Sequence, residues 1–335
     1  MQIIQAPMAG AQDKRLTIAV CQAGGIGSLP AALLSTEKLS EQIKQIQQAV
    51  GDALFNVNFF AHHPPQVSIL QEQEWFNLLK PYLEQYHISI DDIPKSGGRN
   101  PFDEEALAVI QALKPPIVSF HFGLPNDDLL QAVKATGAKI WSSATTVKEA
   151  RYLASKGVDA IIAQGLEAGG HRGMFLSPLA EQMGTFALLP NIIKAVKCPV
   201  IAAGGISDRQ TVRVAEQLGA SAVQVGTAFL LAEEANITVH HRDALQSEAA
   251  EHTVITNLFT GGYARGICTQ FMQENGLVND KVLPFPLAGN AIKILKEKAE
   301  KEGKFDFSSL WAGQNARLAK VGTAADIMKR LQGEK

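Results

Sequence analysis

A glycine-rich segment that contains one histidine is the stretch of this sequence best suited to chemistry. It begins as a short apolar run, Ala160 to Ala163, and continues as a loop with glycines at 165, 169, 170 and 173. Glycines let backbone amides approach a ligand closely. His171 lies among them, and an imidazole near neutral pH can accept a proton or stabilise an anion. His171 is therefore a candidate acid–base group; a tight turn with a solvated histidine is the alternative.

A second histidine follows another apolar run. His121 comes directly after Ile117 to Phe120, and Ser142 ends the next run along the chain. His121 is the other candidate acid–base group, although it can also be a histidine that only fills the interior. Both side chains are candidates for a substrate pocket. Glu167 and Arg172 flank the glycines near His171, and we expect them to form a salt bridge within the loop rather than to act in catalysis.

Two further glycine-containing segments are candidates for a phosphate site. Gly204 and Gly205 follow the apolar residues Pro199 to Ala203, and Gln224-Val225-Gly226-Thr227 ends the next apolar run. Unhindered backbone amides at these positions can donate hydrogen bonds to phosphate oxygens at a helix N-terminus, without any arginine. The alternative is structural, with a glycine turn in the first segment and a helix cap at Thr227.

Side-chain amides end two other apolar runs. Asn58 follows the strand-like residues from Phe55, and Gln164 follows those from Ala160. An amide offers both a donor and an acceptor, which suits a heterocyclic edge such as the pyrimidine ring of a flavin. Asn56 lies on the same side of its run as Asn58, and we expect it to bond within the floor of the fold.

Eight short apolar segments alternate with helical patterns along the first two thirds of the chain. Strands that are buried on both faces read this way, and parallel strands need helical crossovers. Eight of them favour a TIM (β/α)8 barrel over an open doubly wound sheet, whose first turn would carry a glycine fingerprint that Pro7-Met8-Ala9-Gly10 lacks. The predicted strands are 3–5, 26–29, 55–59, 117–120, 139–142, 160–163, 199–203 and 222–225.

In such a barrel the active site lies at the C-terminal ends of the strands. Several polar or glycine residues are predicted to meet there, because each follows an apolar strand. They are Ser28, Asn58, His121, Ser142, Gln164, Gly204, Gly205, Gly226 and Thr227, and the apolar Met8 joins them.

The rest of the chain is predicted to cover the barrel mouth. We expect a barrel core at residues 1–232 and a smaller, mostly helical segment at residues 233–335 that packs back on it as a lid. Two insertions can form the lid, about Phe59 to Pro116 and about Glu233 to Phe285, and the later one is favoured. In the earlier one, Pro64-Pro65 is expected to open a helix to about His87, before a polar loop at residues 91–101.

The composition excludes several classes of partner. The 335 residues are 46% hydrophobic and 19% charged, with a net charge of −2 and dispersed lysines and arginines. This argues against nucleic acid or an anionic membrane surface. No apolar run approaches the roughly 20 residues that span a bilayer, and no signal peptide is recognisable. Three isolated cysteines predict no metal site and a cytoplasmic location. We expect a monomer or small homo-oligomer that acts on a small molecule.

Six segments, taken together, resemble one known family. They are Gln5–Gly10 (QAPMAG), Asn56–Phe60 (NVNFF), Ser119–Gly123 (SFHFG), Gln164–Gly173 (QGLEAGGHRG), Ala202–Ile206 (AAGGI) and Gln224–Thr227 (QVGT). With Leu310–Gln314 (LWAGQ), they cover nearly the whole chain in order and are similar to the nitronate monooxygenases, formerly called 2-nitropropane dioxygenases, of class I. One departure is Ala11 to Arg15, where relatives commonly have Thr-Pro or Ser-Pro, which puts the cap of the first helix in doubt.

The resemblance implies an FMN-containing TIM barrel that oxidises alkyl nitronates with dioxygen and releases nitrite and a carbonyl compound. Propionate 3-nitronate is the expected toxic substrate, and His171 is implied as the catalytic residue. His121 and Ser142 are expected in the substrate pocket. The implied FMN contacts are Met8, Asn58, Gln164, Gly169, Gly170, Gly204, Gly205, Gln224, Val225, Gly226 and Thr227.

Three other functions stay open. A flavin-dependent enoyl-acyl-carrier-protein reductase resembles this chain in the segment Glu167 to His171 and would consume NADH, but His121 within SFHFG argues against it. A non-catalytic flavin-binding barrel would hold FMN without being reduced by a substrate. A phosphosugar enzyme built on the same barrel would hold no flavin.

Overall fold

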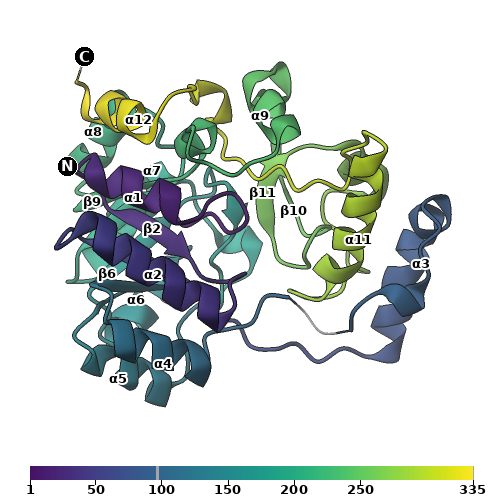
Figure 1. The fold of residues 1–335 in the computed structure, drawn as a ribbon, viewed down its shortest axis with the longest axis horizontal. Coiled ribbons are helices and arrows are strands. Elements are labelled where there is room, and N and C mark those ends of the chain that lie inside the picture. Colours follow the sequence, from purple (N-terminus) through teal and green to yellow (C-terminus); the bar gives the residue numbers. More distant parts are fainter. Residues whose placement is uncertain (96–97, 335) are drawn as a thin grey trace.

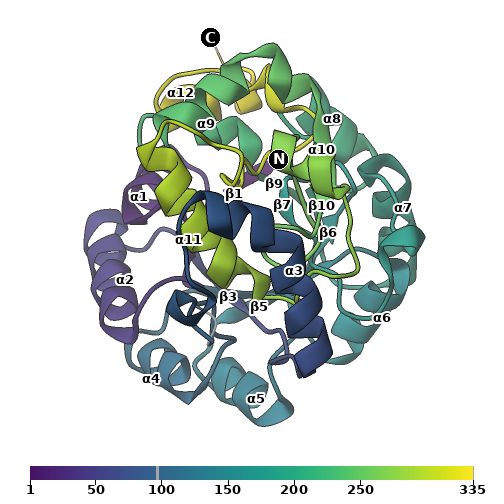
Figure 2. The same cartoon turned by 90° about the vertical axis from the view of Figure 1, so that its right-hand side faces the viewer.

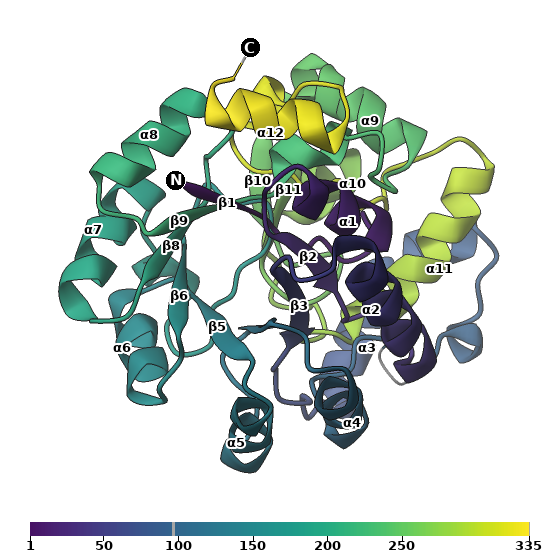
Figure 3. The same cartoon turned by 60° about the vertical axis from the view of Figure 1, so that its left-hand side comes forward.

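The computed structural model describes residues 1–95 and 98–334, and its centre is the predicted eight-stranded parallel barrel (Figure 3). The barrel strands are β1 (Gln2–Gln5), β2 (Gly27–Pro30), β3 (Phe55–Phe60), β4 (Ile117–His121), β5 (Lys139–Ala144), β6 (Ala160–Gln164), β8 (Val200–Ala203) and β9 (Ala222–Val225). Their order in the sheet is β1-β9-β8-β6-β5-β4-β3-β2. A parallel bridge between Ile4 and Ile26 joins the two ends, so the barrel is closed.

Helices surround the strands because each strand is apolar on both faces. Ile3, for example, belongs to the core between strands and helices, whereas Ile4 belongs to the core inside the barrel. The surrounding helices are α1 (Lys14–Gln22), α2 (Thr36–Val50), α4 (Glu104–Leu113), α5 (Asp127–Ala135), α6 (Val147–Ser155), α7 (Thr185–Ala195), α8 (Arg209–Gln217) and α12 (Ala324–Gln332).

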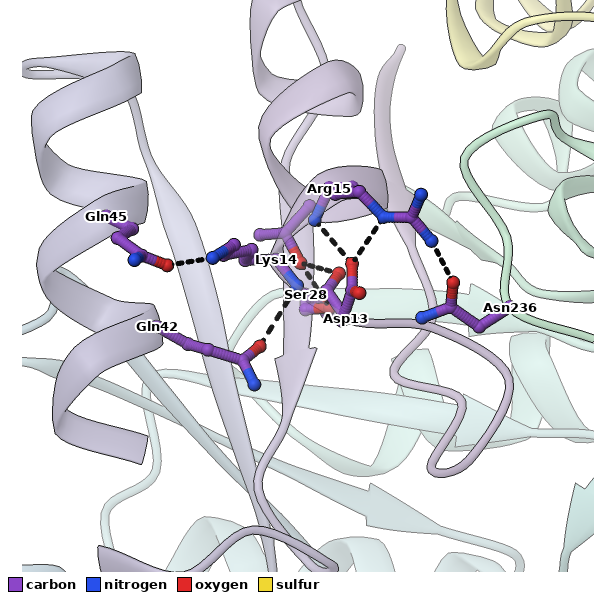
Figure 4. A network of polar contacts seen from close by, with 8 residues as sticks. Asp13, Lys14, Arg15, Ser28, Gln42, Gln45 and Asn236 are labelled. Atoms are coloured by element: carbon purple, nitrogen blue, oxygen red, sulfur yellow. Dashed lines mark hydrogen bonds and ion pairs between the residues drawn. The ribbon is translucent and has the colours of Figure 1, made fainter. Parts of the chain in front are cut away.

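The first helix has a cap of its own in this chain. The Asp13 carboxylate accepts a hydrogen bond from the Arg15 backbone N–H at 2.8 Å, which is typical of an N-cap. The Arg15 guanidinium also donates to Asn236, in the loop before α9 (Val239–Gln246) (Figure 4). Asp13 therefore caps α1 in place of the Thr-Pro or Ser-Pro of relatives. Arg15 connects the start of α1 to the loop before α9.

A second hydrophobic core lies over one end of the barrel (Figure 1, Figure 2). It is formed mainly by α3 (Ile69–Gln85), α10 (Gln270–Asn275) and α11 (Ala288–Lys301), and we call this part of the molecule the mouth unit. Trp75 and Leu79 from the earlier insertion pack in the same core as Phe271 from the later one and Leu295 from α11, which follows it. Both insertions therefore build the lid, whereas the sequence favoured only the later.

Two boundaries predicted from the sequence need correction. α12 returns to the barrel, where Ile327 and Leu331 join the core shared with α1 and α8, so the split at residue 232 does not follow the packing. α3 begins at Ile69 rather than at Pro64-Pro65, because Ser68 and Gln71 form a capping box at that point. Of the expected loop at residues 91–101, residues 96–97 lie outside the described part of the chain.

A small antiparallel sheet, which the sequence did not predict, joins the mouth unit to the barrel. It consists of β7 (Gly170–His171), β11 (Ala264–Ile267) and β10 (Thr253–Thr256). In it His171 pairs with Ala264 and Gly170 pairs with Arg265. None of the helices in the described part of the chain is both long and apolar enough to cross a bilayer.

We expect Leu79→Ala to lower the free energy of unfolding by about 2–5 kcal/mol, because it removes a fully buried side chain from the mouth unit. Leu70→Ala, on the same helix, is the matched control; Leu70 is 63% exposed, and its loss should change stability by only about 0.5 kcal/mol. Urea unfolding measures both. Equal effects of the two substitutions would contradict the packing of α3 described above.

Candidate functional site

A cavity of about 380 Å³ lies where the C-terminal ends of the barrel strands meet the mouth unit. Most residues that the sequence singled out line it, because parallel strands all end at the same rim. They are Met8, Asn58, His121, Gln164, Gly169, Gly170, His171, Gly204, Gly205, Gln224, Gly226 and Thr227. Asn56, by contrast, is fully buried below the cavity and donates to the Ser28 hydroxyl at 3.1 Å, as expected for the barrel floor.

Two predicted site residues have side chains outside the cavity. Successive residues of a strand face opposite sides of the sheet. Ser142 faces outward, where its hydroxyl donates to the Gly123 carbonyl at 2.9 Å, and its neighbour Ser143 lines the cavity instead. The prediction of Ser142 as a pocket residue was thus wrong by one position. The Val225 side chain packs into the core between strands and helices, while Gln224 and Gly226 on either side reach the cavity.

His171 is enclosed by aromatic rings and fixed by a hydroxyl. Its Nε2 lies 2.9 Å from the Thr260 hydroxyl oxygen, and Nδ1 makes no hydrogen bond with any residue the structure describes. The ring is thus held at one nitrogen, and the other is free for a ligand. Its aromatic neighbours are Phe60, Phe122, Phe285 and Trp311, with centroid separations of 5.2 Å to Phe285 and 5.5 Å to Trp311.

Burial keeps both site histidines neutral near pH 7. It lowers the pKa of His171 well below its usual value, and the positive charge of Arg99 lowers it further. Burial also lowers the pKa of His121 to about 4. A neutral imidazole can donate a hydrogen bond from one nitrogen and accept a proton at the other, so His171, which has one nitrogen unbonded, keeps acid–base capacity without carrying a charge.

The backbone carbonyl of His171 is held from two sides. The Nε2 atoms of His121 and Gln164 lie 3.1 Å and 2.9 Å from it. Since a carbonyl only accepts hydrogen bonds, we assign the His121 proton to Nε2, and its Nδ1 accepts from the Ser143 hydroxyl at 2.9 Å. Gln164 Oε1 in turn accepts from the Gly173 N–H at 2.7 Å. Both side chains therefore position the loop as well as line the cavity.

Arg172 and Glu167 do not form the expected salt bridge with each other in the described part of the chain. Arg172 is fully buried and donates to the carbonyls of Gln164 and Gly165, each at 2.8 Å. Glu167 accepts from the backbone N–H and the hydroxyl of Thr185 at 2.9 Å and 2.8 Å. Each charged side chain is therefore satisfied by nearby polar groups rather than by the opposite charge. Backbone carbonyls bind Arg172, and the N–H and hydroxyl of Thr185 bind Glu167.

The loop after β8 requires glycine at two successive positions. Gly204 and Gly205 have φ angles of +117° and +69°, which favour glycine. A Cβ atom on Gly204 would lie only 2.8 Å from the Thr185 hydroxyl oxygen. The backbone N–H groups of Gly205 and Thr227 donate to no other described residue. The two glycine segments thus offer unpaired donors at the cavity wall, as a phosphate group requires.

Two buried polar atoms beside the glycine segments also lack a hydrogen-bond partner among the described residues. Gln224 Oε1 and Ser207 Oγ have no hydrogen-bond partner among the described residues, and both residues line the cavity. Buried polar groups are nearly always paired, so these atoms suit a polar ligand that accepts from a hydroxyl and donates to an amide oxygen. A nucleotide-like group with a phosphate and a heterocyclic N–H has this combination.

Several cavity residues were not identified from the sequence. Arg99 lies in a loop that reads only as polar, and Ser143 was passed over in favour of its neighbour. Trp311 had one signal, since it lies in the LWAGQ segment of the family resemblance. Among the residues described, no group of three histidine, cysteine, aspartate or glutamate side chains is placed to hold a metal ion.

The family model and the curated relatives agree on one family. A family model described as nitronate monooxygenase matches residues 1–334. A nitronate monooxygenase from Paraburkholderia phytofirmans is 41% identical, over 99% of this chain and 91% of that protein. One from Pseudomonas aeruginosa is 37% identical, over 99% and 95%. Among solved structures, a nitroalkane oxidase from Streptomyces ansochromogenes matches with a TM-score of 0.90 at 33% identity, over 99% of this chain and 94% of that one. FabK from Thermotoga maritima gives 0.73 at 25%, over 99% and 91%.

Lowering the pH from about 7 to about 5 should lower the free energy of unfolding. Burial lowers the pKa of His62, His121 and His241 to about 4, whereas an unfolded chain titrates histidine near about 6.5. Between these values the unfolded chain binds more protons, so stability rises with pH. Urea unfolding across this range measures the slope. An unfolding free energy that stays constant, or rises as the pH falls, would show that these histidines are not buried in neutral form.

Proposed function

The chain belongs to the nitronate monooxygenase family, and we propose that it uses FMN to oxidise alkyl nitronates, such as propionate 3-nitronate, with dioxygen. Each nitronate carbon gains one oxygen atom and releases nitrite, leaving a carbonyl compound. A pair of nitronates consumes one dioxygen, so atoms and charge balance. The observation that carries the proposal is His171, a neutral imidazole with one free nitrogen in the same cavity as the unpaired donors of the glycine segments.

The residues present fit FMN. The N–H groups of Gly205 and Thr227 would hold its phosphate, and the Gln224 carbonyl oxygen would accept from a ring N–H. A bound FMN would supply the electron acceptor, because that chemistry belongs to the cofactor. The protein would supply binding, orientation and a cavity closed by the mouth unit.

His171 can serve two kinds of substrate through one nitrogen. When the Thr260 hydroxyl donates to Nε2, the proton of the imidazole lies on Nδ1, which can donate a hydrogen bond to a nitronate oxygen. When Thr260 accepts from Nε2–H instead, Nδ1 is free to remove a proton from a neutral nitroalkane. A nitronate is already an anion and needs only the first arrangement, so it should react faster than the nitroalkane.

We expect the purified protein to be yellow. Anaerobic mixing with propionate 3-nitronate should bleach the flavin, and admission of air should release nitrite. His171→Asn should retain FMN and lose about 10²–10⁴-fold in kcat/KM for nitroethane, since proton abstraction needs the imidazole. His87→Asn, at an exposed histidine, is the control. Stopped-flow absorbance and a nitrite assay measure these steps.

Other results of the same assays point to the rival functions. Steady NADH consumption with a crotonyl thioester, with no nitrite from any nitronate, would favour an enoyl reductase. Bound FMN that no substrate reduces would favour a flavin-binding barrel, and a colourless protein would favour a phosphosugar enzyme. An unchanged rate for His171→Asn with both nitroethane and its nitronate would remove the role of the imidazole.

Gln224→Met should weaken flavin retention without lowering the stability of the flavin-free protein. The Gln224 carbonyl oxygen has no partner among the described residues, so its removal costs the protein no internal hydrogen bond. Flavin released on dialysis and the urea midpoint of the apoprotein measure the two effects. Gln217→Met, at the exposed end of α8, is the control. Equal flavin content in both variants would contradict the contact.

A further inference from the structure

We propose that Arg99 binds a carboxylate carried by the substrate, and so makes the enzyme prefer nitronates with a second negative charge over those with plain alkyl chains. The inference rests on the proposed nitronate oxidation and adds a specificity-determining residue to it. It starts from a cation in the cavity wall for which none of the described residues supplies a partner.

Arg99 has no counter-charge in the described part of the chain. Its side chain is half-buried and lines the cavity, yet no carboxylate or hydrogen-bond acceptor of a described residue contacts its guanidinium. Glu167 is the only acidic residue among those described that lines the cavity, and it is bound to Thr185. A charge taken out of water is costly unless it is paired, so the missing partner is expected to come with the ligand.

Arg99 lies on the same wall as the residue that fixes His171. A Cβ atom built on Gly289 would lie 3.1 Å from Arg99 Nη1 and 4.0 Å from the Thr260 Cα, and the Thr260 hydroxyl bonds the His171 ring. The absence of a side chain at Gly289 therefore leaves room for the guanidinium next to the candidate catalytic residue.

The loop that carries Arg99 is fastened on both sides. Before it, the Asn290 side-chain amide donates to the Pro94 carbonyl at 2.8 Å. After it, the Phe102 N–H donates to the Phe60 carbonyl at 2.8 Å, and the Phe102 ring packs on Phe59 with centroids 4.8 Å apart. The chain before Arg99 is therefore held by α11 at Pro94, and the chain after it is held at Phe102 by β3, whose end lines the cavity.

These positions divide the recognition of one substrate between two groups. The free nitrogen of His171 suits the nitronate oxygens, which need a single donor. A planar guanidinium suits a carboxylate, which it can bind through two parallel hydrogen bonds. A short chain with a nitronate at one end and a carboxylate at the other can use both groups, whereas a plain alkyl nitronate leaves Arg99 unpaired.

Steady-state kinetics with two matched substrates test the proposal. Propyl 1-nitronate has a methyl group where propionate 3-nitronate has its carboxylate. Arg99→Met keeps an unbranched, flexible side chain but shortens it and removes its charge. We expect kcat/KM for propionate 3-nitronate to fall about 10- to 100-fold, mainly through KM, and kcat/KM for propyl 1-nitronate to stay the same. Arg99→Lys should keep part of the preference. Lys95→Met, an exposed cation in the same loop, is the control and should change neither value.

A binding measurement separates this inference from the proposed function. Titration of the holoprotein with propionate, followed by tryptophan fluorescence because Trp311 lines the cavity, should give a dissociation constant that Arg99→Met raises. Equal losses with both nitronates, or no loss with either, would overturn the carboxylate site. If the parent protein releases no nitrite from any nitronate but binds propionate through Arg99, the proposed function fails and the anion site stands.

Discussion

The arrangement of this site depends on holding a short irregular segment of backbone, residues 164–173, in one conformation. Such a loop exposes carbonyls that no regular element satisfies, and an unpaired buried carbonyl is costly. Arg172 resolves this by placing its buried guanidinium against two of them. His121 and Gln164 bond a third, that of His171. The ring of His171 can face the cavity because its backbone is fixed by the barrel behind it.

The mouth unit completes this restraint from the other side. β7 pairs with β11, so the backbone of His171 also belongs to a sheet that the barrel does not contain. Thr260, Phe285 and Trp311 fix the ring from the same side. The barrel and the mouth unit therefore both have to be folded before the imidazole has its position, which explains why a unit with its own core stays on the barrel mouth.

Local patterns in the sequence predicted the barrel and most of the residues that line the cavity, because the strand ends of a parallel barrel converge at one rim. Ser142 was predicted because the apolar run was taken to end there, whereas β5 continues to Ala144 and Ser143 is the residue that faces inward. The Glu167–Arg172 pair was misjudged because opposite charges close in sequence suggest an ion pair, while the carbonyls that actually bind Arg172 leave no mark in side-chain types. β7, the joint lid and Arg99 depend on contacts between segments far apart in the sequence, such as the pairing of His171 with Ala264, which no local pattern encodes.

The electrostatics of the cavity fit an enzyme for an anion that must also let its product go. In the proposed reaction, a cationic imidazole beside the reacting group would attract the nitronate and the nitrite product alike and would slow the release of the product. A neutral imidazole gives a directed hydrogen bond with less attraction for every anion. If Arg99 then binds the far end of the substrate, affinity comes from a part of the molecule that does not react. Under the proposed function, separating affinity from chemistry in this way would let the cavity take up one class of anions without retaining the small anion that the reaction releases.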